Sequence, residues 1–165
     1  MSEITLVSKE GTKIQISSQF SNLSGFIHNI LQDYQQNEDI SLASVSFINL
    51  QMILEYAVHH NFQVPQPPRC PITSPNIADN VSDPWDAEFV NRLNEDQIID
   101  LVTATNFLDM KSLMDLCLAK IACMFKYKDI ETLRKEYGIT EEFTAEIEEK
   151  LKSDFPWAME AESND

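Results

Sequence analysis

Residues 105–125, TNFLDMKSLMDLCLAKIACMF, carry apolar side chains nearly all the way round a predicted helix. From Leu113 to Phe125 the only charged residues are Asp115 and Lys120. A surface helix of a small domain normally keeps one polar face. The second face of this helix therefore needs a cover, which either the core of the protein or a partner must supply.

The charges of the chain narrow the choice of partner. A membrane-spanning helix needs about 20 mostly uncharged residues, and Asp109, Lys111, Asp115 and Lys120 interrupt this stretch. The amino terminus alternates like a strand and has no basic region before an apolar block, so we expect no secretory signal. Twenty-seven acidic and 12 basic residues give a net charge of -15, which repels phosphate backbones and anionic lipids. We expect neither a nucleic acid nor a membrane partner.

The three cysteines, Cys70, Cys117 and Cys123, show no CxxC spacing, and two of them fall in the apolar stretch. This pattern is typical of reduced core thiols and predicts neither a disulfide framework nor a zinc site. We expect a cytoplasmic and nuclear protein. A hydrophobic content of 43% is enough for a core in one domain or two very small ones.

Short strands and two helices are predicted in the first part of the chain. Apolar residues alternate with polar ones on either side of Gly11, which predicts a β-hairpin carried by Ile4, Leu6, Ile14 and Ile16. Apolar residues then recur at helical spacing over 20–34 and over 47–58, with a short strand at 40–42 between them.

Six of the seven prolines lie in residues 63–84, where their fixed φ and missing N–H groups oppose helices and ladders. The sequence predicts a mobile loop with little to bury. Shortening it should leave the stability of the protein nearly unchanged.

The second part of the chain, from Asn94 onward, is predicted to be helical. Asn94 with Gln97 predicts a capping box, and Asp109 is placed to cap the apolar helix. Asp129 is expected to begin another helix that Gly138 ends, and a last amphipathic segment follows.

Residues for catalysis are scarce. Only three glycines are present and they lie far apart, so no glycine-rich phosphate loop is predicted. His59 and His60 are adjacent, which points them to different sides of their helix and favours a polar helix end over a ligand pair. We expect no catalytic residue, no cofactor and no metal. The alternative from a different class is a thiol-dependent enzyme that pairs Cys117 or Cys123 with a histidine.

Five segments in the order ITLVSKEGTKIQI, EYAVHH, DPWDAEF, TNFLDMKSLMDL and LRKEYGITEEFT resemble the S-phase kinase-associated protein one family, the small adaptors of SCF ubiquitin ligases. The resemblance covers nearly the whole chain. It implies an α+β fold, with a BTB/POZ core of short strands and packed helices followed by carboxy-terminal F-box-binding helices. The implied division is a core at 1–128 with the proline-rich loop at 63–84, F-box-binding helices at 129–157 and an acidic tail at 158–165.

The resemblance also implies a non-catalytic adaptor that links a cullin scaffold to F-box substrate receptors. The family's cullin-binding positions fall on Asn106 and Phe107. Its F-box-binding positions fall on Met114, Leu118, Ile121, Tyr137, Ile139 and Trp157. An F-box protein would then cover the second face of the apolar helix, and a homodimer is a further expectation for the chain without that partner.

Other interpretations of these residues stay open. Spacing alone favours ordinary core positions for Phe107, Met114, Leu118 and Ile121, whereas Trp157 beside a proline near the acidic tail has little core within reach. An elongin-C-like adaptor for another cullin complex shares the core but ends before the carboxy-terminal helices. The chain also departs from the family pattern, because its loop is proline-rich rather than strongly acidic and Phe107 replaces the more usual tyrosine.

Overall fold

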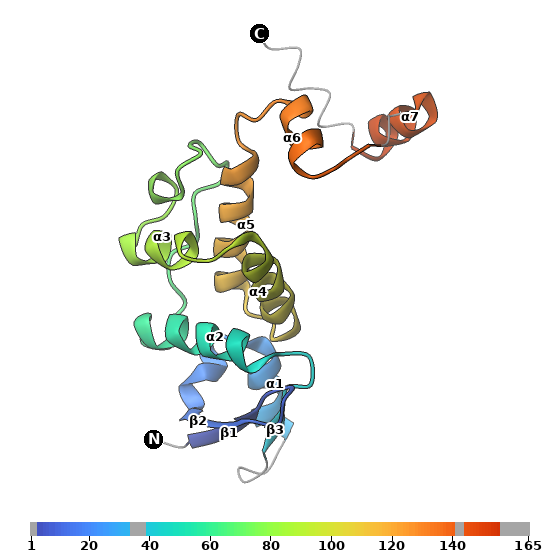
Figure 1. The fold of residues 1–165 in the computed structure, drawn as a ribbon. Coiled ribbons are helices and arrows are strands. Elements are labelled where there is room, and N and C mark those ends of the chain that lie inside the picture. Colours follow the sequence, from blue (N-terminus) through green and yellow to red (C-terminus); the bar gives the residue numbers. More distant parts are fainter. Residues whose placement is uncertain (1–2, 34–38, 141–143, 156–165) are drawn as a thin grey trace. The chain divides into compact units, whose positions relative to one another are not determined.

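The computed structural model describes residues 3–33, 39–140 and 144–155, which form a small sheet and a larger set of helices (Figure 1). The chain divides into two compact units, residues 1–127 and 128–165. The elements in chain order are β1 (Glu3–Val7), β2 (Lys13–Ser17), the 3-10 helix η1 (Ser18–Asn22), α1 (Gly25–Asp33), β3 (Ile40–Ser41), α2 (Phe47–His59), the 3-10 helix η2 (Ile77–Asp79), α3 (Pro84–Asn91), α4 (Glu95–Phe107), α5 (Lys111–Phe125), α6 (Ile130–Glu136) and α7 (Ala145–Asp154). The fold class is α+β, as predicted.

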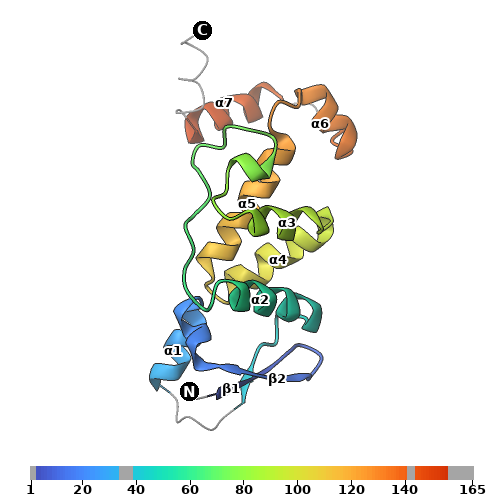
Figure 2. The same cartoon turned by 90° about the vertical axis from the view of Figure 1, so that its left-hand side faces the viewer.

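The predicted β-hairpin is confirmed. Strands β1 and β2 pair antiparallel, with Leu6 opposite Ile14 and Ile4 opposite Ile16. Strand β3 pairs in parallel with β1, so the sheet has the order β2-β1-β3. Figures 1 and 2 show this sheet at one end of the first unit, with α2 between it and α3 and α4.

The helix predicted to run on from residue 20 is instead two elements, η1 and α1. The buried hydroxyl of Ser24 donates to the carbonyl of Leu108 at 2.6 Å, and the N–H of Gly25 donates to the carbonyl of Asp109 at 3.1 Å. These two groups bond to the turn between α4 and α5, and not to other residues of one continuous helix. A long-range contact therefore sets the start of α1 at Gly25.

Asp109 does not cap α5, so this prediction was wrong. The N-cap position is Met110, which makes no side-chain cap bond. Asp109 has a φ of 51° and holds its carboxylate over Gly25, where an added Cβ would lie 2.0 Å from Oδ2 of Asp109. A side chain at residue 25 would have to displace the carboxylate of Asp109, while the backbone carbonyl of Asp109 joins α1 to the α4–α5 turn.

Two other predicted helix starts are confirmed. The side chain of Asn94 accepts from the N–H of Gln97, and the side chain of Gln97 accepts from the N–H of Asn94, which completes a capping box on α4. Oδ1 of Asp129 accepts from the N–H of Thr132 at 2.8 Å at the start of α6. Gly138 follows this helix with a φ of 62°, a conformation that glycine adopts easily.

The proline-rich segment at 63–84 is mostly exposed or half-buried, but two of its residues are buried, and its mobility and dispensability stay predictions. Ile77 in η2 is 1% exposed and Asn80 is fully buried. The amide of Asn80 donates to the carbonyls of Ser74 and Asn76 at 2.9 and 3.0 Å. A buried asparagine with these partners gives the segment an internal polar core that proline content does not reveal.

The same segment is fastened to α5 (Figure 2). Sγ of Cys123 donates to the carbonyl of Ser74 at 3.4 Å and accepts from the amide of Asn80 at 3.6 Å. Beyond the helix, the hydroxyl of Tyr127 donates to the carbonyl of Thr73 at 3.4 Å. The segment therefore supports the carboxy-terminal end of α5.

Helix α5 packs one side into the core of the first unit. Its buried residues are Leu113, Leu116, Cys117, Ala119 and Cys123.

Within the described ranges of the chain, no helix combines the length and the apolar character that crossing a membrane requires.

We predict that Asn80→Ala destabilises the protein by about 1–3 kcal/mol, because it removes the bonds from the Asn80 amide to the carbonyls of Ser74 and Asn76 and leaves the N–H of Thr73 without its acceptor. Urea unfolding of the full chain measures this loss. Asn29→Ala, at an exposed position of α1, is the matched control and should change the free energy of unfolding by about 0.5 kcal/mol or less. Equal stability of the two variants would mean that the segment is dispensable after all.

Candidate partner-binding surfaces

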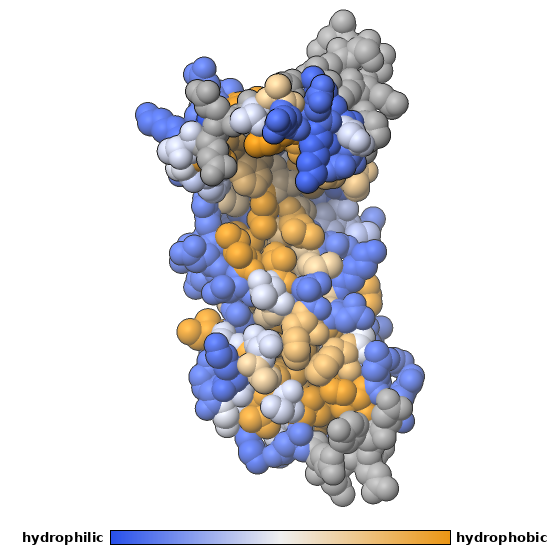
Figure 3. All heavy atoms as spheres, turned by 90° about the vertical axis from the view of Figure 1, so that its right-hand side faces the viewer, coloured by the Kyte–Doolittle hydropathy of each residue, from blue (hydrophilic) through white to orange (hydrophobic). Residues whose placement is uncertain are grey.

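Helix α5 keeps one side outside the core. Met114, Leu118 and Ile121 follow one another at intervals of four and three residues, which places them on one side of the helix. Met114 and Ile121 are half-buried and Leu118 is 44% exposed. Figure 3 shows apolar side chains gathered on the side of the molecule where α4 and α5 lie. Three of the predicted F-box-binding residues thus share one surface.

Sequence reasoning missed one member of this surface. Phe125 comes four residues after Ile121, so it lies on the same side of α5, and its side chain is 40% exposed. The spacing of the apolar residues could have identified it. We call Met114, Leu118, Ile121 and Phe125 the α5 face.

The second unit, residues 128–165, holds the remaining predicted F-box-binding residues. Tyr137 and Ile139 lie at and just beyond the end of α6, with 39% and 51% of their surface exposed. Among the described residues of this unit, no side chain is buried. Trp157 lies outside the described residues. The two helices of this unit therefore carry apolar residues for which the described part of the unit offers no core.

The predicted cullin-binding residues occupy the last turn of α4. Asn106 is exposed, whereas Phe107 is half-buried and packs its ring against Phe26, with the centroids 5.0 Å apart. The N–H of Leu108 closes the helix by donating to the carbonyls of Ala104 and Asn106. The α5 face and these two residues thus belong to different helices of the first unit.

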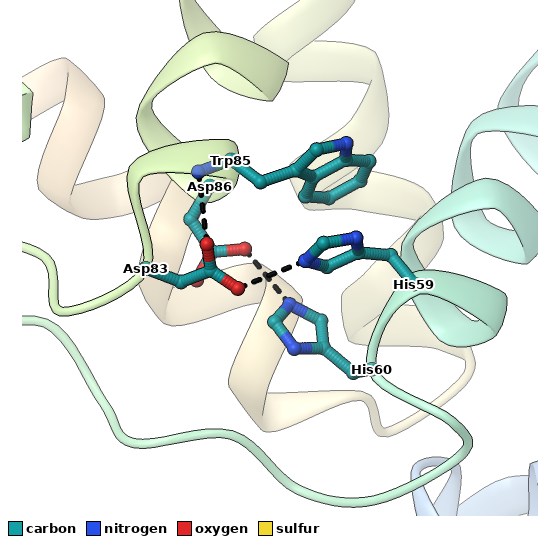
Figure 4. Close-up of polar contacts among 5 residues, drawn as sticks. All are labelled: His59, His60, Asp83, Trp85 and Asp86. Atoms are coloured by element: carbon teal, nitrogen blue, oxygen red, sulfur yellow. Dashed lines mark hydrogen bonds and ion pairs between the residues drawn. The ribbon is translucent and has the colours of Figure 1, made fainter.

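Two histidine–aspartate pairs join the end of α2 to the start of α3 (Figure 4). Nε2 of His59 lies 2.8 Å from Oδ2 of Asp83, and Nε2 of His60 lies 2.8 Å from Oδ1 of Asp86. The ring of His59 stacks on Trp85 at 3.9 Å between centroids. The sequence predicted that the two imidazoles point to different sides of the helix, but both rings turn toward α3 (Figure 4). His60 is the C-cap residue, so both rings can turn toward α3.

The two histidine–aspartate pairs differ in how deeply they are buried. The side chains of His60 and Asp86 are 8% and 7% exposed, and desolvation raises the pKa of Asp86 while the hydrogen bond from His60 opposes that rise. The pair of His59 and Asp83 is 31% and 39% exposed, and the hydrogen bond from His59 lowers the pKa of Asp83.

Donor atoms of His59, His60 and Asp83 lie within 4.8 Å of one another, a spacing that a metal ion can use. The two bonds to carboxylates already engage Nε2 of both imidazoles, so a metal ion bound at Nε2 would have to displace them. We interpret the cluster as a clamp that holds the two ends of the proline-rich segment together.

Comparison with known proteins identifies the family. The model for the Skp1 family tetramerisation domain matches residues 2–62, and that for the Skp1 family dimerisation domain matches residues 111–158. An S-phase kinase-associated protein 1 homolog of Tetrahymena thermophila is 34% identical over 98% of this chain and 96% of its own length. The chain belongs to the Skp1 family.

Fungal relatives agree with this assignment. The E3 ubiquitin ligase complex SCF subunit sconC of Arthroderma benhamiae is 30% identical, over 96% of both chains. The protein of the same name from Neosartorya fischeri is 29% identical over 97% of this chain and its entire own length. The two Skp1 models together cover the sheet, α1 and α2 at one end of the sequence and α5, α6 and α7 at the other.

The thiols of this Skp1-family chain are poor nucleophiles where they are buried. Burial raises the pKa of Cys117 to about 12 and raises the pKa of Cys123 above its usual range. A thiol with a raised pKa holds less of the reactive thiolate at neutral pH. Because Sγ of Cys123 is also engaged with Ser74 and Asn80, the two thiols serve packing rather than thiol chemistry.

We predict that His60→Ala costs about 3 kcal/mol of stability near pH 7, because it leaves the carboxylate of Asp86 buried without its partner. Without that hydrogen bond the pKa of Asp86 rises further. A raised pKa in the folded state means that the folded chain binds the proton more tightly, so the stability of the variant falls as the pH rises above 3.8, the ordinary value.

Urea unfolding at pH 4.5 and 7.5 measures this dependence, and the deficit relative to the natural chain should be larger at pH 7.5. His59→Ala is the matched control, and it should cost about 1 kcal/mol or less because its pair is partly exposed. Equal deficits for the two variants would contradict the larger role given to the buried pair of His60 and Asp86.

Proposed function

We propose that this chain holds a cullin and an F-box protein at the same time, on two separate surfaces of one small scaffold. As a Skp1-family member, it is a non-catalytic adaptor subunit of an SCF-type E3 ubiquitin ligase. Its contribution is geometric: it fixes the distance and orientation between the two partners. Cytoplasmic and nuclear localisation, and a homodimer of the free chain, stay predictions.

The α5 face carries the F-box half of the proposal. An apolar face of this kind on a soluble protein marks a partner surface when it is large and continuous. The four residues of the face are spaced along the helix from Met114 to Phe125, and the apolar residues of α6 and α7 are exposed as well. An F-box protein that binds the α5 face would bury the exposed apolar surface of Leu118 and Phe125.

Asn106 and Phe107 support the cullin half. They lie at the end of α4, a different helix from the α5 face, and the turn that follows is tied to α1 by the bonds of Ser24 and Gly25. A side chain on a rigid helix end is preorganised for binding, because little entropy is lost when a partner arrives. Each partner could then bind without disturbing the other.

The two alternatives fit less well. An elongin-C-like adaptor ends before the carboxy-terminal helices, whereas this chain forms α6 and α7 and matches the Skp1 dimerisation model through residue 158. A thiol-dependent enzyme needs a reactive thiolate, and burial raises the pKa of both Cys117 and Cys123, which disfavours the thiolate.

We predict reciprocal losses for two sets of variants. Asn106→Ala combined with Phe107→Ala should weaken cullin binding by about 2 kcal/mol or more, and leave F-box binding intact. Leu118→Glu should weaken binding of an F-box domain by a similar amount and leave cullin binding intact, because it puts a charge on the apolar α5 face. Calorimetric titration of the full chain with each purified partner measures all four affinities.

Each variant set serves as the control for the other, and circular dichroism checks that both remain folded. Loss of both partners from one folded variant would contradict separate surfaces. Unchanged F-box affinity in Leu118→Glu would remove the α5 face from the proposal.

A further inference from the structure

The first part of the proline-rich segment has the backbone that proline imposes. Residues 64–69 read VPQPPR and form neither helix nor strand, and we call them the proline stretch. Proline fixes its own φ at about -65° and restricts the residue before it to an extended backbone. Each of residues 64–68 is a proline or precedes one, so all five are biased toward polyproline II, a left-handed helix in which three residues make one turn.

The burial of the proline stretch repeats with the same period of three. In Figure 2 the segment is the green trace that leaves α2 and runs beside α5. Pro65 and Pro68 share one edge and are both half-buried, over a small cavity whose other walls include Tyr56 and Leu116. The residues of the other two edges are exposed, and they are Val64 with Pro67 and Gln66 with Arg69. One edge thus rests on the rest of the first unit, and two edges face solvent.

Hydrogen bonds hold the proline stretch in place. The N–H of Gln63 donates to the carbonyl of His60 at 3.0 Å, and the N–H of Arg69 donates to the carbonyl of Asn80 at 2.7 Å. Between these two points, the hydroxyl of Ser82 donates to the side-chain carbonyl of Gln66 at 3.1 Å. Within the described part of the chain, residues 64–68 make no backbone–backbone hydrogen bond. Their backbone carbonyls are therefore available to a partner.

These properties match one mode of peptide recognition. Proline-rich segments in the polyproline II conformation dock into grooves lined by aromatic side chains, and a preformed helix loses little entropy on binding. The two exposed edges offer the side chain of Val64, the ring of Pro67 and the guanidinium of Arg69. Arg69 is the only basic residue in 63–84, and a carboxylate at the rim of such a groove would pair with it. A second copy of this chain is a poor candidate, because two chains with a net charge of -15 repel each other.

We propose that the proline stretch is a docking site for a proline-recognition domain of the SH3, WW or EVH1 kind. The aromatic-lined groove of this domain takes the two exposed edges, and a carboxylate of the domain pairs with Arg69. Pro65 and Pro68 keep their place against the first unit. None of these residues belongs to the α5 face or to the end of α4, so the site adds a third partner and does not rest on the proposed function.

The test begins with titration of the full chain, labelled with nitrogen-15, with a panel of purified SH3, WW and EVH1 domains. At least one domain should shift the NMR signals of the amides of Val64, Gln66 and Arg69, the residues of the proline stretch that carry an N–H. Shifts centred there would place the bound domain on the proline stretch.

Calorimetric titration with that domain then measures the contribution of the exposed edges. Val64→Ser/Pro67→Ala and Arg69→Glu should each weaken binding about tenfold or more. Both should keep the melting temperature of the natural chain, since the altered side chains are exposed. Pro75→Ala, at an exposed proline of the same segment outside the proline stretch, is the matched control and should bind like the natural chain.

Several results would overturn the proposal. They are the absence of amide shifts in the proline stretch with every domain of the panel, shifts centred elsewhere, and an affinity that Val64→Ser/Pro67→Ala leaves within twofold of the natural value. Weaker binding of a cullin or an F-box domain by that variant would assign the stretch to those partners instead. A chain that binds a panel domain but neither a cullin nor an F-box protein would support the docking site and overturn only the proposed function.

Discussion

The junction between α1 and the α4–α5 turn is the interaction on which the remaining geometry depends. Ser24 and Gly25 bond to the carbonyls of Leu108 and Asp109, and the rings of Phe26 and Phe107 pack beside them. These contacts span more than 80 residues of sequence. They attach the sheet and its helices to the helical second half of the first unit, at the point where the proposed cullin surface ends and α5 begins.

A second attachment lies at the end of α2, where His60 and Asp86 form a buried pair. A buried pair contributes little net stability compared with apolar packing, but breaking it is costly because one charge is left alone. The proline-rich segment starts and ends beside this pair and is fastened to α5 through Asn80 and Cys123. The first unit is thus held at three places that are far apart in the sequence, which suits a scaffold whose purpose is a fixed distance between partners.

Local patterns predicted what local interactions determine. The alternation around Gly11 gave the correct hairpin, and the capping residues Asn94 and Asp129 gave correct helix starts, because each depends on residues within a few positions. Predictions failed where a distant partner decides the outcome. The sequence predicts Asp109 as a helix cap because it does not show that Gly25 lies beside Asp109 in the fold. The spacing of apolar residues likewise does not reveal that Asn80 is buried. The place of Phe125 on the α5 face was readable from the spacing of the apolar residues.

The close approach of Asp109 to Gly25 also determines how mutant alleles of this chain should behave. A side chain there would have to displace the carboxylate of Asp109, whose backbone carbonyl bonds to Gly25 at the turn between α4 and α5. We expect an allele that replaces Gly25 to loosen this turn and to weaken both proposed partner surfaces together. Alleles at the exposed surfaces would instead separate the two functions, so the position of a lesion would determine whether its phenotype is complete or partial.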